Sequence, residues 1–168
     1  MRIAAVGLVV ILAALVAWGL IRKSDDSGGG NGASTQVVTA QELRQEAAGG
    51  RPIYWVGTEP GSRLQLTRAE AGRVLLRYLG SNGSSPPLTV GTYPFANAAD
   101  SLRARGERAG GAWQKLPGGE VVYFNTGRPT SVYVAQPGSD YEVEVYDPSP
   151  KRALQLAVSG AVERVPRP

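Results

Sequence analysis

The sequence predicts an α+β domain, in which helices pack on an antiparallel sheet of about six or seven strands. Short segments that alternate apolar and polar residues recur along the chain, and this two-residue period is typical of strands. Turn signals such as "EPGS" and "TGRP" separate neighbouring segments by a few residues, which favours antiparallel hairpins over parallel crossovers. Three other segments carry helix-capping residues or apolar residues at helical spacing.

The amino-terminal segment differs from the rest of the chain, because residues 3–21 contain no charged side chain. A helix of that length spans about 28 Å, close to the thickness of the hydrocarbon core of a bilayer. A cleaved signal peptide has a shorter apolar region and small residues before its cleavage site, whereas Trp18 stands here shortly before Arg22 and Lys23. We therefore expect residues 1–23 to form an uncleaved transmembrane anchor, which contacts the membrane through residues 3–21.

Residues 24–35 are rich in Gly, Ser, Asp and Asn, a composition that predicts a flexible linker. Residues 36–168 are then long enough for one α+β domain. Positive charges are balanced on the two sides of the anchor, and two aspartates after it tilt the orientation toward an external carboxy-terminal part. We expect a single-pass protein of the cell membrane with an extracytoplasmic domain.

The first predicted helix of this domain covers residues 40–48. Thr39 and Glu42 have the spacing of a capping box, and Gly49 is expected to end the helix in a left-handed conformation. Four strands follow, with the third placing Val74, Leu76 and Tyr78 on one face. These strands are predicted at residues 52–57, 63–67, 72–80 and 88–93.

The second half of the domain begins with a helix over residues 95–105, because Phe95, Ala98, Ala99 and Leu102 fall on one helical face. Three strands are expected in "GEVVYFN", "TSVYVAQ" and "YEVEVYD", and their short turns favour an antiparallel meander. A last helix starts with Ser149 as cap and Pro150 in the first helical position.

The composition excludes several chemistries. The chain has no cysteine and no histidine, so a thiol nucleophile, a disulfide, the usual Cys/His zinc site and a Ser-His-Asp triad are all impossible. No phosphate-binding glycine motif opens a helix. The net charge is +4, of which residues 24–168 carry +1, and no block of like charges appears. We expect no cofactor, no metal site and no nucleic-acid partner.

Glu142 and Glu144 alternate with apolar residues and lie on one face of a predicted strand, about 6.5 to 7 Å apart. Such a pair could serve as acid and base in glycoside cleavage. The same alternation is typical of a solvated strand face, and this is the interpretation that we favour. The sequence therefore identifies no catalytic residue and favours a role without catalysis.

Aromatic residues are the better candidates for ligand contacts, because Tyr and Trp combine a broad apolar face with a polar group. Tyr54 and Trp55 are adjacent in a predicted strand, where they suit a core equally well. Trp113 stands between two glycine pairs in "GGAWQKLPGG", where a loop or an edge strand is expected. These three residues form the predicted ligand-binding set.

The segments "PIYWVG", "GRVLLRYLG" and "LTVGTYP", together with the closing strand and helix, resemble uncharacterised single-anchor extracytoplasmic proteins of high-GC Gram-positive bacteria. The excess of arginine over lysine is in keeping with that origin. The resemblance covers most of residues 50–160. It implies an anchored extracytoplasmic domain and no catalytic residues.

The leading functional hypothesis is a membrane-anchored interaction or ligand-binding module of the bacterial cell envelope, with an envelope protein or a glycan as partner. Two alternatives stay open. One is a histidine-free hydrolase that acts on envelope polymers, and the other is a structural subunit of a membrane complex. A pocket with convergent carboxylates would favour the hydrolase, whereas an exposed aromatic patch would favour binding.

Overall fold

The computed structural model describes residues 33–80, 86–108 and 110–168. The predicted anchor, residues 1–23, lies outside the described residues, as does almost all of the predicted linker. In the part of the chain that the structure describes, no helix is both long and apolar enough to cross a membrane. The described elements belong to one compact unit, Gly32–Pro168.

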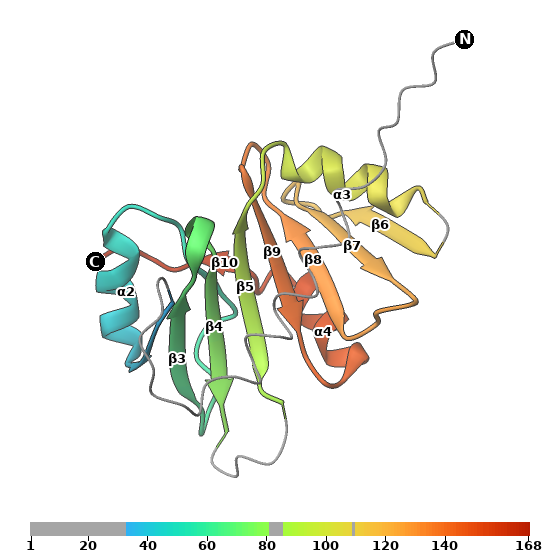
Figure 1. Cartoon of the computed structure of the whole chain (residues 1–168). Coiled ribbons are helices and arrows are strands. Elements are labelled where there is room, and N and C mark those ends of the chain that lie inside the picture. Colours follow the sequence, from blue (N-terminus) through green and yellow to red (C-terminus); the bar gives the residue numbers. More distant parts are fainter. Residues whose placement is uncertain (1–32, 81–85, 109) are drawn as a thin grey trace. The chain divides into compact units, whose positions relative to one another are not determined.

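Eight antiparallel strands form the main sheet, in the order β1-β3-β4-β5-β9-β8-β7-β6 (Figure 1). The predicted α+β class is confirmed, and the sheet has one or two strands more than expected. Its two halves are joined by the pairing of β5 with β9. The strands are β1 (Ser34–Val38), β3 (Arg63–Arg68), β4 (Val74–Leu79), β5 (Leu88–Pro94), β6 (Gly111–Lys115), β7 (Val121–Asn125), β8 (Ser131–Ala135) and β9 (Tyr141–Tyr146).

The two additional strands are the edges of this sheet: β1, which the sequence did not predict, and β6, where the sequence left a loop or an edge strand open. β1 begins at Ser34, so the boundary predicted for the linker is wrong by two residues: the chain is already paired with β3 from there on. Four of the five residues of β1 are exposed and only Val38 is buried, so the strand has no apolar alternation to reveal it. An edge strand needs few apolar side chains, because its backbone pairing holds it in place.

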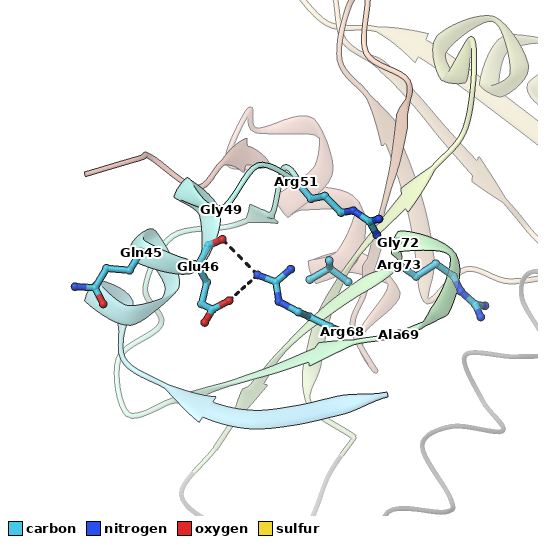
Figure 2. Close-up of a pocket in the computed structure, with 9 residues that line it drawn as sticks. Gln45, Glu46, Gly49, Arg51, Arg68, Ala69, Gly72 and Arg73 are labelled. Carbon is cyan, nitrogen blue, oxygen red and sulfur yellow. Dashed lines mark hydrogen bonds and ion pairs between the residues drawn. The ribbon is translucent and has the colours of Figure 1, made fainter. Parts of the chain in front are cut away.

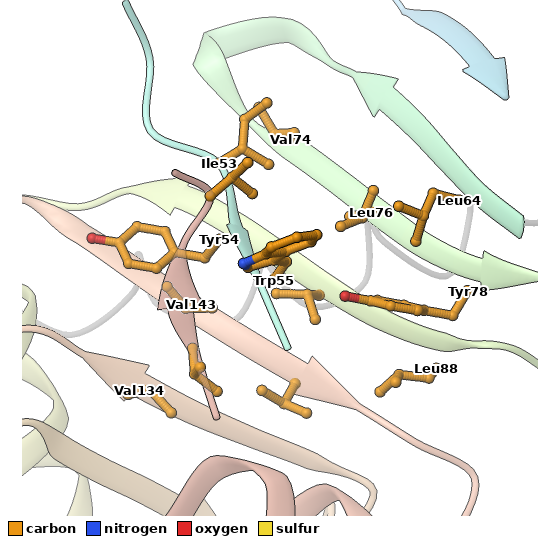
Figure 3. Close-up of a cluster of buried hydrophobic side chains, with 14 of the residues drawn as sticks. Ile53, Tyr54, Trp55, Leu64, Val74, Leu76, Tyr78, Leu88, Val134 and Val143 are labelled. Atoms are coloured by element: carbon orange, nitrogen blue, oxygen red, sulfur yellow. The ribbon is translucent and has the colours of Figure 1, made fainter. Parts of the chain in front are cut away.

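One face of the sheet, the covered face, packs against two helices and a two-stranded ribbon. These elements are α2 (Ala40–Ala48), α4 (Pro150–Val158) and the antiparallel pair of β2 (Tyr54–Trp55) with β10 (Glu163–Arg164). Figure 3 shows the aromatic rings of β2 among aliphatic side chains of β3, β4, β5, β8 and β9. The predicted grouping of Val74, Leu76 and Tyr78 is confirmed, and all three belong to this core. The predicted strand over residues 52–57 is therefore real but short, and it lies outside the main sheet.

The opposite face carries only one described helix, α3 (Ala98–Gly106), which packs on β6, β7 and β8. Ala98 and Leu102 are fully buried there against Val121, Tyr123 and Ala135. The predicted helix is confirmed except at its start. Phe95 is 43% exposed and precedes the helix, because the left-handed backbone of Asn97 (φ 54°) turns the chain before Ala98.

The helix caps follow the sequence closely. Thr39 Oγ1 accepts a hydrogen bond from the backbone N–H of Glu42, whose Oε2 accepts one from the N–H of Thr39, so the capping box is confirmed. Ser149 caps α4 without a capping box: its Oγ accepts a hydrogen bond from the backbone N–H of Arg152 at 3.4 Å. The prediction for Gly49 is wrong, since its φ is −70°; the left-handed residue is the next one, Gly50, with a φ of 113°.

Candidate functional site

A cavity of about 610 Å³ lies between the end of α2 and the connection from β3 to β4 (Figure 2). This connection contains a short 3-10 turn, η1 (Glu70–Gly72). We call the cavity the arginine pocket, because three of its nine lining residues are arginines. The lining consists of Gln45, Glu46, Gly49, Arg51, Arg68, Ala69, Gly72, Arg73 and Val74.

The turn at η1 gives the pocket its shape. The backbone N–H of Ala69 donates a hydrogen bond of 2.9 Å to the carbonyl oxygen of Arg73, and this bond closes the connection between the two strands. Inside it, Ala71 and Gly72 have φ values of 55° and 76°. A Cβ at Gly72 would stand 2.5 Å from Nη1 of Arg51, so the end of that side chain would have to shift. The guanidinium of Arg51 therefore rests directly on the backbone of η1.

Arg68 connects the pocket to α2. Its Nη2 donates to Oε2 of Glu46 at 2.6 Å and to the backbone carbonyl of Glu46 at 3.3 Å. The hydrogen bond and the charge of Arg68 lower the pKa of the Glu46 carboxyl. A cation near the last turn also suits the partial negative charge of a helix carboxy terminus. Arg68 is thus a structural residue with part of its guanidinium still facing the cavity.

The other two arginines have no carboxylate partner among the described residues. Figure 2 shows the guanidinium of Arg51 beside Gly72 of η1 and that of Arg68 directed toward Glu46, whereas the side chain of Arg73 extends away past η1. Nε of Arg73 donates to the carbonyl of Glu70 at 3.2 Å. The lining therefore holds three cations and one carboxylate, Glu46. Guanidinium groups bind carboxylates and phosphates through paired hydrogen bonds, so the pocket suits an anion.

The structure buries two of the three predicted ligand-binding residues. Tyr54 is 6% and Trp55 is 4% exposed, and both belong to the core under β2. The hydroxyl of Tyr54 lies 3.5 Å from Oγ of Ser139, and Nε1 of Trp55 donates to Glu163 at 3.1 Å. Their polar groups are therefore engaged within the chain.

Trp113 lies elsewhere, in the edge strand β6, and is 38% exposed. Its ring packs on Gly106 of α3, and the guanidinium of Arg103 lies 5.8 Å from the ring centroid. Trp113 stands on the face that carries α3, whereas Tyr54 and Trp55 lie under the covered face. The structure does not bring the three residues together, and a ligand role for Trp113 stays a prediction.

The carboxylate pair has a different environment from the one expected. Glu142 is 6% exposed, so a solvated strand face is the wrong interpretation for this residue. Its carboxylate accepts a hydrogen bond from Arg105 of α3. Burial raises the pKa of Glu142, and the nearby Arg105 opposes that rise. The sequence did not reveal this burial, because α3 covers β9 from a distant part of the chain.

Glu144 accepts hydrogen bonds from the hydroxyls of Tyr93 at 2.9 Å and Tyr133 at 3.4 Å. Burial and the charge of Glu144 raise the pKa of both tyrosines. Arg105 lies over the ring of Tyr133 and over that of Tyr123, at 5.4 and 5.2 Å. Glu142 is thus paired with Arg105 of α3, and Glu144 with tyrosines of the strands β5 and β8.

A smaller cavity of about 350 Å³ lies at the start of α3. It is lined by charges of both signs, including Asp100, Asp140, Arg103 and Lys115, and so has no clear preference for a ligand charge. Among the residues that the structure describes, no group of three acidic, His or Cys side chains could hold a metal ion.

Comparison with known proteins provides no relative: no family model, no curated protein and no solved structure matches this chain.

The sequence interpretation missed the arginine pocket. Its arginines are 17 and 5 positions apart, and only the packing of α2 beside the end of β3 brings them together. One local signal was present, since "EAGR" places a glycine in the short connection between two strands and next to an arginine. A glycine in a short strand connection often marks a left-handed turn.

Proposed function

We propose that this chain is a membrane-anchored extracytoplasmic binding module of the bacterial cell envelope, and that its arginine pocket takes an anionic ligand. The observation that carries the proposal is the guanidinium of Arg51. It faces a cavity of about 610 Å³, rests on Gly72 and has no carboxylate partner among the described residues. An exposed guanidinium without a carboxylate partner leaves its hydrogen-bond donors for a ligand.

The state of the carboxylates supports binding over hydrolysis. A general acid and a general base must reach the substrate, whereas Glu142 is paired with Arg105 and Glu144 with two tyrosines. The volume of the arginine pocket lies within the range of small-molecule sites. The charge-free run at residues 3–21 supports the anchor and the envelope location.

A titration tests the proposal with the fragment 34–168, which contains every residue of the two described cores. We expect inorganic phosphate to shift the backbone resonances of η1 and of the end of α2, with a Kd of about 1 mM, since few charge-assisted bonds are available. The variant Arg51→Gln should weaken binding about tenfold or more.

Arg63→Gln is the matched control for this titration. Arg63 is exposed and begins the strand that Arg68 ends, so the variant has the same charge change at the far end of β3. It should bind phosphate as the unchanged fragment does. Equal weakening by both variants, or no saturable shift at η1, would contradict an anion site in the arginine pocket.

A further inference from the structure

We infer that the anion taken by the arginine pocket is the phosphate of a negatively charged membrane lipid, an inference that rests on the proposed function. Three features support a lipid: the place where the chain enters the domain, the reach of the preceding segment, and the groups that line the pocket.

The chain enters the domain beside the pocket. The first residue of β1, Ser34, pairs directly with Arg68 at the end of β3. Opposite residues of an antiparallel pair have Cα atoms about 4.5 to 5.5 Å apart. Arg68 in turn lines the pocket. Whatever precedes Ser34 in the chain is therefore attached at the pocket end of the sheet and not at the opposite end, where Arg63 lies.

The segment between the proposed anchor and β1 is short. Residues 24–33 are ten residues of mostly Gly, Ser, Asp and Asn. A flexible chain of that length has a root-mean-square span of about 17 Å and cannot extend beyond about 35 Å. Such a tether gives a nearby surface an effective concentration in the millimolar range. A weak phosphate site at this end of the domain is thus presented repeatedly to lipid headgroups.

The lining suits a headgroup better than an acyl chain. Apolar side chains are supplied only by Ala69 and Val74, whereas guanidinium, carboxylate and amide groups make up most of the rest. Arginine binds phosphate through two parallel N–H bonds and loses its own hydration water readily. Glu46 balances one of the three arginines and the lining stays positive, so a headgroup with a net negative charge is favoured over a zwitterionic one, whose own cation this lining repels.

The test uses the full chain in lipid nanodiscs of two compositions, phosphatidylcholine alone and phosphatidylcholine with about 30 mol% phosphatidylglycerol. The measurement is hydrogen exchange of the backbone amides at residues 69–74. With the anionic lipid, exchange should slow about fivefold, the factor expected when the local lipid concentration is about four times the Kd. Arg51→Gln should remove this protection, and Arg63→Gln should retain it.

A second arm separates the lipid from a soluble source of the same phosphate group. Soluble glycerol 1-phosphate and poly(glycerol phosphate) are added to the full chain in phosphatidylcholine discs. Protection of residues 69–74 by the anionic discs, competed by excess glycerol 1-phosphate, supports the inference. Protection by the soluble compounds with none from the anionic discs overturns the lipid inference and leaves the anion site in place. No protection in any arm overturns both.

Discussion

Arg105 compensates the buried charge of Glu142, and the variant Arg105→Met should show how much this ion pair contributes to the stability of the fold. The side chain of Glu142 is 8% and that of Arg105 is 18% exposed. Removing one member of a buried ion pair costs about 3 to 5 kcal/mol, because the other charge stays in a medium of low polarity. The small exposure of Arg105 and the nearby tyrosine hydroxyls lower this cost. We expect the fragment 34–168 to lose about 3 kcal/mol at neutral pH.

The loss should depend on pH in a defined direction. Burial already raises the pKa of Glu142, and removing Arg105 takes away the group that opposes the rise. A carboxyl with a folded-state pKa above its unfolded value of 4.5 favours the folded state when it is protonated. The deficit of Arg105→Met should therefore be largest above the folded-state pKa, shrink as the pH falls, and be smallest near about pH 4.5.

Urea unfolding followed by tryptophan fluorescence measures these free energies. Adding Glu142→Gln to Arg105→Met should recover most of the loss, because it removes the uncompensated carboxylate while keeping its shape. Arg108→Met is the control: Arg108 is exposed two residues after α3, and its loss should cost no more than about 0.5 kcal/mol. A deficit that is unchanged between neutral and acidic pH, or a double variant no more stable than Arg105→Met, would refute this account.

Four further outcomes are expected. Burial raises the pKa of Tyr78 to about 12, so the stabilisation by its neutral hydroxyl is complete well below pH 10 and should fall by about 3 kcal/mol as the pH rises past 12; Tyr78→Phe should remove this part of the alkaline loss in urea unfolding. Gly72→Ala should weaken phosphate binding as much as Arg51→Gln does, because its Cβ displaces Arg51; unchanged affinity would speak against the pocket geometry. The fragment 34–168 should be soluble and melt in one calorimetric transition, and persistent aggregation would count against an autonomous domain. Protease added to intact spheroplasts should digest the domain and spare a cytosolic control, whereas a protected domain would contradict the external location.

The sequence predicted local structure well where one segment carries the whole signal. The capping box of Thr39 and Glu42 is such a case, because both members of the interaction lie within four residues. The face shared by Val74, Leu76 and Tyr78 is another, since strand alternation alone determines it. The edge strands were harder to predict for the opposite reason: β1 was not predicted, and β6 was left between a loop and an edge strand. β1 and β6 are held by backbone pairing with a neighbour, and their side chains are mostly exposed.

The sites depended on long-range packing and were largely beyond prediction. Glu142 alternates with valines as a solvated residue does, and only the arrival of α3 over β9 makes it buried. Trp55 is a residue type that often contacts ligands, but here it is part of the core, because the β2–β10 ribbon packs on the covered face of the sheet. Arg51 and Arg68 line the same cavity because of the position of α2 relative to η1. No spacing rule within one element contains that information.

The place of β1 at the sheet edge also determines how the domain bears mechanical load. Any tension that reaches the domain through its amino-terminal side acts first on Ser34, and β1 is held by five residue pairs along a single neighbour, β3. Because only Val38 of this strand is buried, β1 can peel from the edge while α2, the ribbon and α4 keep the core intact. Strand pairs that open one after another yield at lower force than pairs that shear together. We therefore expect β1 to be the first described element to open when its amino-terminal end is pulled.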